Sequence, residues 1–231
     1  NYITAARPFF VWTEQERIYP NIAAHIKGAN LDKEHKKDYL TTKQVARLLG
    51  AIDRSTLKGL RDYAMLSVMV TTGLREISIV RADIGDIRTA GDAVALFYQG
   101  KGHEEKADYV KLAEPVEEAV RAYLKARGGA DHKAPLFSSI ANRNSGERMT
   151  TRSVSRVAKE RLIAVGLESD RLTGHSMRHT AATLNLLNGG TVEETRQLLG
   201  HTNINTTLIY SHALERAKNN SEERIAKAIF G

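Results

Sequence analysis

The chain has 231 residues, of which 42% are hydrophobic and 26% are charged, as in an ordinary globular protein. It holds no cysteine, which excludes disulfide bonds, thiolate zinc sites and a thiol nucleophile and is compatible with a reducing cytosol. The net charge of +7 favours a polyanionic partner, although charge alone gives nucleic acid only even odds.

The first forty residues predict the end of one domain followed by a linker. Phe9 to Trp12 form an apolar cluster, and Pro8 is expected to start or kink a helix rather than lie in its middle. Residues 1–20 cannot close a core alone, so we expect a remnant of a preceding domain, with residues 21–40 as the linker. The chain begins with Asn and shows neither a signal peptide nor an apolar run of bilayer length, which indicates a fragment of a cytoplasmic protein.

From residue 41 onward, capping residues and glycines mark the ends of successive helices. Thr41 or Thr42 can cap a helix that ends before Gly50. Residues 57–72 are apolar almost all round, which predicts a buried helix. A short helix is predicted over residues 76–81.

The middle of the chain predicts a hairpin and then a helix. Residues 93–99 and 107–112 are rich in β-forming side chains and flank a loop with two glycines, as in an antiparallel hairpin. Residues 114–127 begin with acidic and end with basic side chains, an order that complements the helix dipole. The residues that follow, up to about 150, are rich in loop-forming side chains.

The last third of the chain predicts three more helices. One covers residues 151–165 and carries four basic side chains. A second is capped by Thr173 or Ser176 and ends at the glycine pair 189–190, and a third opens with a capping box at Thr191. Together these elements predict an α+β fold that is mostly helical, with one small antiparallel sheet.

Six side chains are suited to acting on a phosphodiester, and each has a plainer interpretation when taken alone. His175 and Arg178 are three residues apart, hence on one helix face, where both can reach one anion. A single histidine near a helix start is more often a capping or surface residue, and a single tyrosine is more often part of a core. The six candidates are Arg75, Lys101, His175, Arg178, His201 and Tyr210.

The candidates lie in motifs whose order and spacing resemble those of the tyrosine recombinases, the phage-integrase-like family that cuts and rejoins DNA. The motifs are GLR, GKG, HxxRH and LLGH, with a tyrosine nine residues after the last histidine. The resemblance covers residues 41–212 and implies that they form that family's catalytic domain. It implies that Tyr210 is the nucleophile of a 3′-phosphotyrosyl intermediate, that Lys101 is the hairpin lysine, and that the other four candidates complete the site.

The resemblance also bears on the two ends of the chain. It implies that residues 1–20 are the last helix of a core-binding domain, and that residues 213–231 form a tail that docks on a neighbouring subunit. The implied assembly is a homotetramer on double-stranded DNA, with DNA-bending accessory proteins as further partners. The apolar stripe of Ile225 and Ile229 fits this docking role, and packing within the same chain is the competing interpretation.

One position departs from the family pattern. Many members carry an acidic residue three positions after the first arginine, whereas this chain has Ser78 there and Glu76 directly beside Arg75. The departure changes how Arg75 is expected to be supported, and the arginine itself is present.

The chemistry of these residue types agrees with the resemblance. Guanidinium groups neutralise the charge that protects a phosphodiester, and a mobile ammonium such as that of Lys101 can protonate a departing 5′ oxygen. Exchange of one phosphodiester for another needs no nucleotide hydrolysis, and the chain has no GxxxxGK[ST] or HExxH motif. We therefore predict neither a cofactor nor a metal.

Two further predictions concern DNA contacts and biological role. The basic face of helix 151–165 can enter a groove, with Arg152 and Arg156 as DNA-binding residues, and a solvated charged face is an equally weighted alternative. The favoured role is an integrase of a mobile element. The alternatives are a type IB topoisomerase-like relaxing enzyme, a chromosome-dimer-resolving recombinase, and a DNA-binding module without cutting activity.

Overall fold

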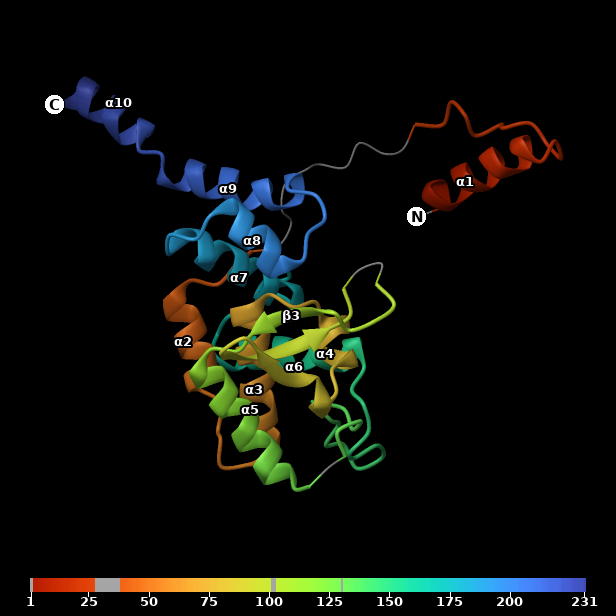
Figure 1. The fold of residues 1–231 in the computed structure, drawn as a ribbon. Helices are drawn as coiled ribbons and strands as arrows, with labels where there is room; N and C mark the ends of the chain where they lie inside the picture. The colour runs from red at the N-terminus through yellow and green to blue at the C-terminus, as the bar shows by residue number, and fades with distance from the viewer. Residues whose placement is uncertain (1, 28–37, 101–102, 130) are drawn as a thin grey trace. The chain divides into compact units, whose positions relative to one another are not determined.

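The structure is a computed structural model that describes residues 2–27, 38–100, 103–129 and 131–231, apart from the side chains of residues 212, 213 and 215–218. The chain divides into two units, residues 1–35 and 36–231. Figure 1 shows the elements of both units in chain order. The boundary between the units falls inside residues 21–40, the segment predicted to be a linker.

The described part of the first unit is one helix followed by turns. Helix α1 (Tyr2–Gln15) contains Pro8 in its interior, so the prediction that Pro8 would not lie in the middle of a helix was wrong. Proline removes one backbone donor and costs a helix interior about 3 kcal/mol. The apolar side chains after it offset part of this cost, because the ring of Phe9 lies 5.4 Å from that of Phe10 and 6.1 Å from that of Trp12.

Helices make up most of the second unit, and each helix predicted from residue 41 onward is confirmed to within two or three residues at its ends. Thr41 caps the first of them in a reciprocal capping box with Gln44. The helices are α2 (Thr42–Gly50), α3 (Leu57–Thr72), α4 (Glu76–Arg81), α5 (Glu114–Arg127), α6 (Thr151–Ala164), α7 (Gly174–Leu187), α8 (Val192–Leu199), α9 (Asn205–Lys218) and α10 (Ser221–Phe230).

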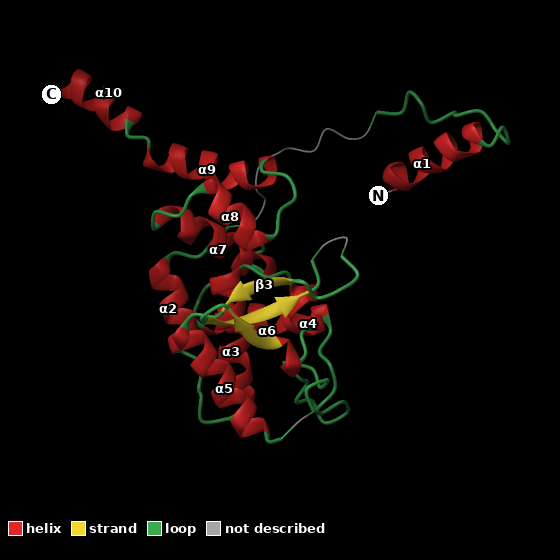
Figure 2. Ribbon diagram, viewed as in Figure 1, coloured by secondary structure: helices red, strands yellow, loops and turns green. Residues whose placement is uncertain are grey.

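The sheet has three antiparallel strands in the order β1-β2-β3, and Figure 2 shows it in yellow among the helices. The predicted hairpin is confirmed as β2 (Ala93–Tyr98) and β3 (Asp108–Lys111). Strand β1 (Ile87–Ala90) was missed, because its two central side chains are both exposed and it therefore lacks the alternation that predicts a strand. It follows a one-turn 3-10 helix, η1 (Ile84–Asp86).

The C-terminal region contains two helices that were not predicted, α9 and α10. Helix α9 runs from Asn205 to Lys218, so the predicted boundary between catalytic domain and tail at residue 212 lies inside a continuous helix. Helix α10 carries the predicted apolar stripe, and Ile225 and Ile229 are both more than half exposed.

Helix α3 lies at the centre of this unit, as its apolar sequence predicts, and it packs against α5 and α7. Helix α6 packs against α4 and α7, and helices α7, α8 and α9 pack on one another. These contacts bring the ends of α3 and α8 next to the first turns of α7. Among the described residues, no helix is both long and apolar enough to cross a membrane.

Candidate active site

The first element of the site is the turn between α3 and α4. Gly73 ends α3 in the left-handed conformation, with a φ of 65°, and Arg75 is the half-buried residue before α4. A β-carbon on Gly73 would lie 2.6 Å from Cδ2 of Leu199, at the end of α8. Glycine is therefore needed at this position for both its backbone conformation and its lack of a side chain.

This close approach leads to a stability prediction. Replacing Gly73 by alanine is expected to lower the free energy of unfolding by about 2–4 kcal/mol, because left-handed strain adds to overpacking against Leu199. Gly166 is the matched control, since it has a φ of 70° and a β-carbon added there would have no described atom within 4 Å. Gly166→Ala is expected to cost only about 1 kcal/mol. Denaturant unfolding measures both, and equal losses would show that the contact with Leu199 contributes nothing.

Arg178 lies one turn into α7 and joins the turn to α8. Its side chain is buried, and it donates hydrogen bonds of 2.6 Å to the carbonyl oxygens of both Gly73 and Leu199. Burial lowers the pKa of Arg178 to about 10, and the nearby charge of Arg75 contributes to the lowering. Two guanidinium groups within electrostatic reach of each other repel, and an anion bound between them would relieve that repulsion.

His201 follows the left-handed glycine that ends α8. The imidazole is buried, and its Nδ1 lies 2.9 Å from Oγ1 of Thr207, which leaves Nε2 as the ring nitrogen that can face a substrate. Burial lowers the pKa of His201 to about 4, assisted by Arg178, Arg75 and Arg196. The imidazole is therefore neutral at physiological pH.

The lowered pKa predicts a pH dependence of stability. An unfolded histidine binds a proton below its ordinary pKa of 6.5, whereas folded His201 resists protonation until the pH reaches about 4. The free energy of unfolding is therefore expected to fall by roughly 2–3 kcal/mol from this residue as the pH drops through that window. Unfolding curves of wild type and His201→Gln between these pH values test this, and the same slope in both would contradict it.

Tyr210 lies on α9 and is buried in a small apolar cluster with Ala182 and Leu199. Its ring meets that of His179 edge to face, with centroids 4.9 Å apart. Burial raises the pKa of Tyr210, while Arg178 and Arg75 lower it in part. The phenol is thus protonated at neutral pH and lies within electrostatic reach of both arginines.

The other two catalytic candidates are less defined. His175 is the exposed second residue of α7, one turn before Arg178. Lys101 falls outside the described residues. The structure thus brings Arg75, Arg178, His201 and Tyr210 together electrostatically, and it places His175 on the same helix as Arg178.

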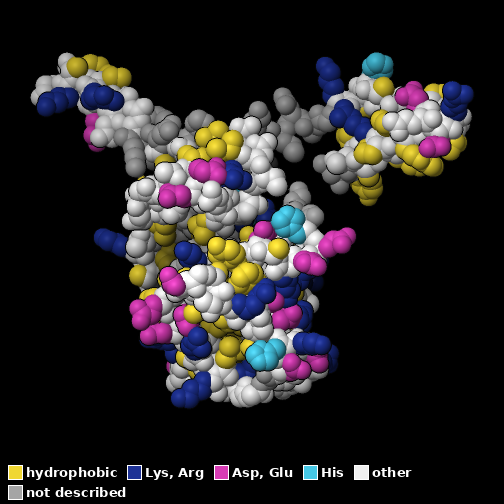
Figure 3. Space-filling view, in the orientation of Figure 1, with side chains coloured by type: hydrophobic (Ala, Val, Ile, Leu, Met, Phe, Trp, Pro, Cys, Tyr) yellow, Lys and Arg dark blue, Asp and Glu magenta, His cyan; other side chains and the backbone are white. Residues whose placement is uncertain are grey.

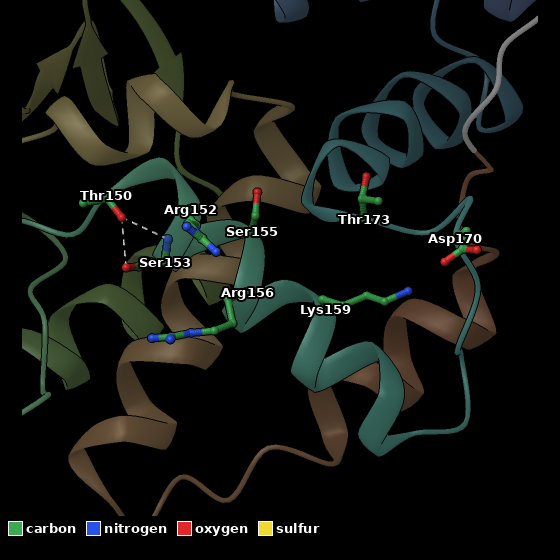
Figure 4. A pocket seen from close by; sticks show the side chains of 8 residues that line it. All are labelled: Thr150, Arg152, Ser153, Ser155, Arg156, Lys159, Asp170 and Thr173. Carbon is green, nitrogen blue, oxygen red and sulfur yellow. Dashed lines mark hydrogen bonds between the residues drawn. The ribbon is translucent and has the colours of Figure 1, made fainter.

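The predicted DNA-binding side chains lie on one face of α6. Arg152 and Arg156 line a pocket of about 660 Å³ together with Lys159, whose Nζ donates to the carbonyl oxygen of Ser169. Figure 4 shows these three cations along α6, with Asp170 and the start of α7 across from them. On the face seen in Figure 3, by contrast, basic and acidic side chains are interspersed. The pocket therefore gathers positive charge where the visible surface does not.

Sequence reasoning missed several residues that hold this site together. Thr207 fixes the imidazole of His201, and a β-carbon on Gly200 would lie 3.0 Å from the buried hydroxyl of Tyr98. Burial raises the pKa of Tyr98, and both site arginines act on it. The signals in the sequence were the threonines shortly before Tyr210 and a tyrosine two residues before the GKG motif. Neither of them predicts a contact by itself.

The sequence is similar to a known family and to individual curated proteins. Residues 38–216 match the model of the family described as the phage integrase family. The chain is 33% identical over 221 residues to the tyrosine recombinase XerC of Chlamydia muridarum, covering 94% of this chain and 67% of that protein. It is 30% identical over 216 residues to the XerC of Caldanaerobacter subterraneus subsp. tengcongensis, covering 91% of this chain and 57% of that protein.

Solved structures give the same fold. The crystal structure of XerA recombinase matches with a TM-score of 0.63 and 26% identity, over 99% of this chain and 74% of that chain. The XerH site-specific recombinase bound to its difH substrate matches with a TM-score of 0.69 and 21% identity, over 94% of this chain and 60% of that chain. The predicted fold class, a mostly helical domain with a small antiparallel sheet, is confirmed.

Proposed function

Because the chain belongs to the phage integrase family, the tyrosine recombinases, we propose that it cuts and rejoins DNA at specific sites through a 3′-phosphotyrosyl intermediate. The observation that carries the proposal is that the charges of Arg75 and Arg178 act on both the buried imidazole of His201 and the buried phenol of Tyr210. The chain spans 67% and 57% of the length of the two curated relatives described above, so the activity of a whole protein of this kind is a proposal for this chain.

The proposed catalytic residues divide the steps of the exchange among them. Arg75 and Arg178 neutralise the non-bridging oxygens of the scissile phosphate and stabilise the pentavalent transition state. The Tyr210 oxygen attacks phosphorus and gives up its proton, while His201 and His175 donate hydrogen bonds or accept that proton. The bond from phosphorus to the 5′ oxygen breaks, and Lys101 protonates that oxygen. One phosphodiester replaces another, so no high-energy cofactor is consumed.

DNA is the proposed partner, and Arg152 and Arg156 are its proposed contacts on α6. Three cations in the α6 pocket against one carboxylate, Asp170, support a phosphate-binding surface there. The proposed assembly is a homotetramer on paired sites, in which the tail docks through α10. The exposure of Ile225 and Ile229 supports this role for the helix.

The curated relatives bear on the biological role. Both relatives described above are named XerC, and this favours chromosome-dimer resolution over the mobile-element integrase hypothesized from the sequence. Type IB topoisomerase-like relaxation is an alternative activity. Incubation with a supercoiled plasmid that carries two copies of the cleaved site distinguishes a recombinase from a topoisomerase. Steady relaxation without recombinant products would favour the topoisomerase.

Covalent capture tests the proposed chemistry. A pool of labelled, nicked duplexes with a randomised core is incubated with the protein, and the DNA that remains attached after denaturation is sequenced. The expected result is a protease-sensitive adduct enriched in one sequence, with the attachment mapped to Tyr210 by mass spectrometry. Tight DNA binding without any adduct would instead indicate a binding module.

A further inference from the structure

One carboxylate, that of Glu76, lies between the turn that carries Arg75 and the start of the helix that carries Arg178. It is two residues before Ser78, the position where the chain departs from the family pattern. Glu76 is the first residue of α4 and directly follows Arg75 in the sequence. Its Oε1 accepts a hydrogen bond of 2.6 Å from the hydroxyl of Ser155 on α6. This length is typical of a hydroxyl that donates to a charged carboxylate.

The same carboxylate oxygen packs against the first residue of α7. A β-carbon on Gly174 would lie 2.1 Å from Oε1 of Glu76 and 3.4 Å from Cα of Ser155. Any side chain at Gly174 would therefore displace the carboxylate. Gly174 is buried, and the residues that follow it along α7 include His175 and Arg178.

Glu76 thus lies at a junction of three helices, and each of the three carries or adjoins proposed functional residues. Helix α4 follows Arg75, α6 carries Arg152 and Arg156, and α7 carries the HxxR pair. A carboxylate at the beginning of α7 is also favoured by the dipole of that helix. Ser78, at the position where many family members have an acid, is buried in α4.

We infer that Glu76 is a positioning residue for the proposed cleavage reaction. Its carboxylate, held by Ser155 and seated against Gly174, sets where Arg75 lies relative to Arg178. The inference rests on the proposed function, because the spacing of two guanidinium groups matters only if they bind one phosphate. A displacement of about 1 Å in such a pair can lower a rate by about 100-fold.

The primary test is the rate of covalent complex formation in a single turnover at saturating DNA, using the full chain and the captured site. Glu76→Ala is expected to slow cleavage by about 10- to 100-fold, with DNA affinity close to wild type and a small fall in melting temperature from loss of the Ser155 hydrogen bond. Glu76→Gln keeps an oxygen that can accept the Ser155 hydrogen bond, so it is expected to retain most of the rate. Gly174→Ala displaces the carboxylate from the other side and is expected to reproduce the defect of Glu76→Ala.

A double-mutant cycle separates positioning from general support of the fold. If Glu76 acts through Arg75, adding Glu76→Ala to Arg75→Lys is expected to cost less than about 3-fold, since the group being positioned is already altered. A merely structural role would multiply the two defects. Multiplied defects, or a Glu76→Ala variant that cleaves like wild type, would overturn the inference and leave the proposed function standing. A wild-type chain that forms no adduct would instead remove the proposed function.

Discussion

Replacing Tyr210 by phenylalanine is expected to abolish the covalent adduct with DNA while leaving the fold and DNA binding intact. The oxygen proposed as the nucleophile is lost, but the ring remains to fill the apolar cluster with Ala182 and Leu199 and to meet His179 edge to face. Loss of a covalent nucleophile lowers the rate by at least about 10⁴-fold, which is the order found for such residues in other covalent enzymes. Labelled nicked duplex and denaturing electrophoresis measure the adduct, and a mobility-shift assay measures binding.

Tyr98 provides the matched control for this prediction. It is a second buried tyrosine on which both site arginines act, and its pKa is raised by burial as well. Tyr98→Phe is expected to retain the adduct. An adduct that persists in Tyr210→Phe and disappears in Tyr98→Phe would assign the nucleophile to Tyr98 and refute the assignment made from sequence spacing.

Local signals account for most of the fold that could be predicted from the sequence. Thr41 caps α2 and Thr191 caps α8, each with a side chain three residues later, and these contacts form within a few residues of chain. Gly73 and Gly200 end helices in left-handed conformations that other residues avoid. Strand β1 and the interior proline of α1 were not predicted, because pairing and packing decide them rather than local preference.

The candidate site was predictable as a set of residues but not as an arrangement. The motifs placed Arg75, Arg178, His201 and Tyr210 in one catalytic set. Nothing local indicates that Arg178 hydrogen-bonds two carbonyl groups 105 and 21 positions away in the chain. The junction at Glu76 was equally hidden, because it depends on how closely α7 approaches α4 and α6.

The charge state of the site follows from burial and neighbouring charges. His201 is neutral and Tyr210 is protonated at physiological pH, so the two arginines supply the positive charge that acts on the phenol. A bound phosphate would lower the repulsion between the guanidinium groups, and it would also reduce their lowering of the Tyr210 pKa. The proposed reaction therefore needs a proton acceptor, a role that suits a neutral imidazole.

Replacing Arg178 by alanine is expected to lower the cleavage rate by about 10³-fold or more while DNA binding is largely kept, because the role proposed for this side chain is to stabilise charge that develops in the transition state. Two of its five N–H groups are used on the carbonyl oxygens of Gly73 and Leu199, and three are available to a phosphate. The free energy of unfolding should also fall, by about 1–3 kcal/mol for each buried carbonyl left without a donor.

Arg178→Lys separates the catalytic effect from the structural one. A lysine keeps the positive charge but has a single ammonium, which cannot donate to two carbonyl groups and also grip a phosphate with a planar fork. We therefore expect partial recovery of stability in this variant with little recovery of cleavage. Measurement of the unfolding free energy, DNA affinity and single-turnover rate in both variants decides the matter. If DNA binding were abolished at wild-type stability, Arg178 would serve to hold the ground-state substrate, and the transition-state role would be wrong.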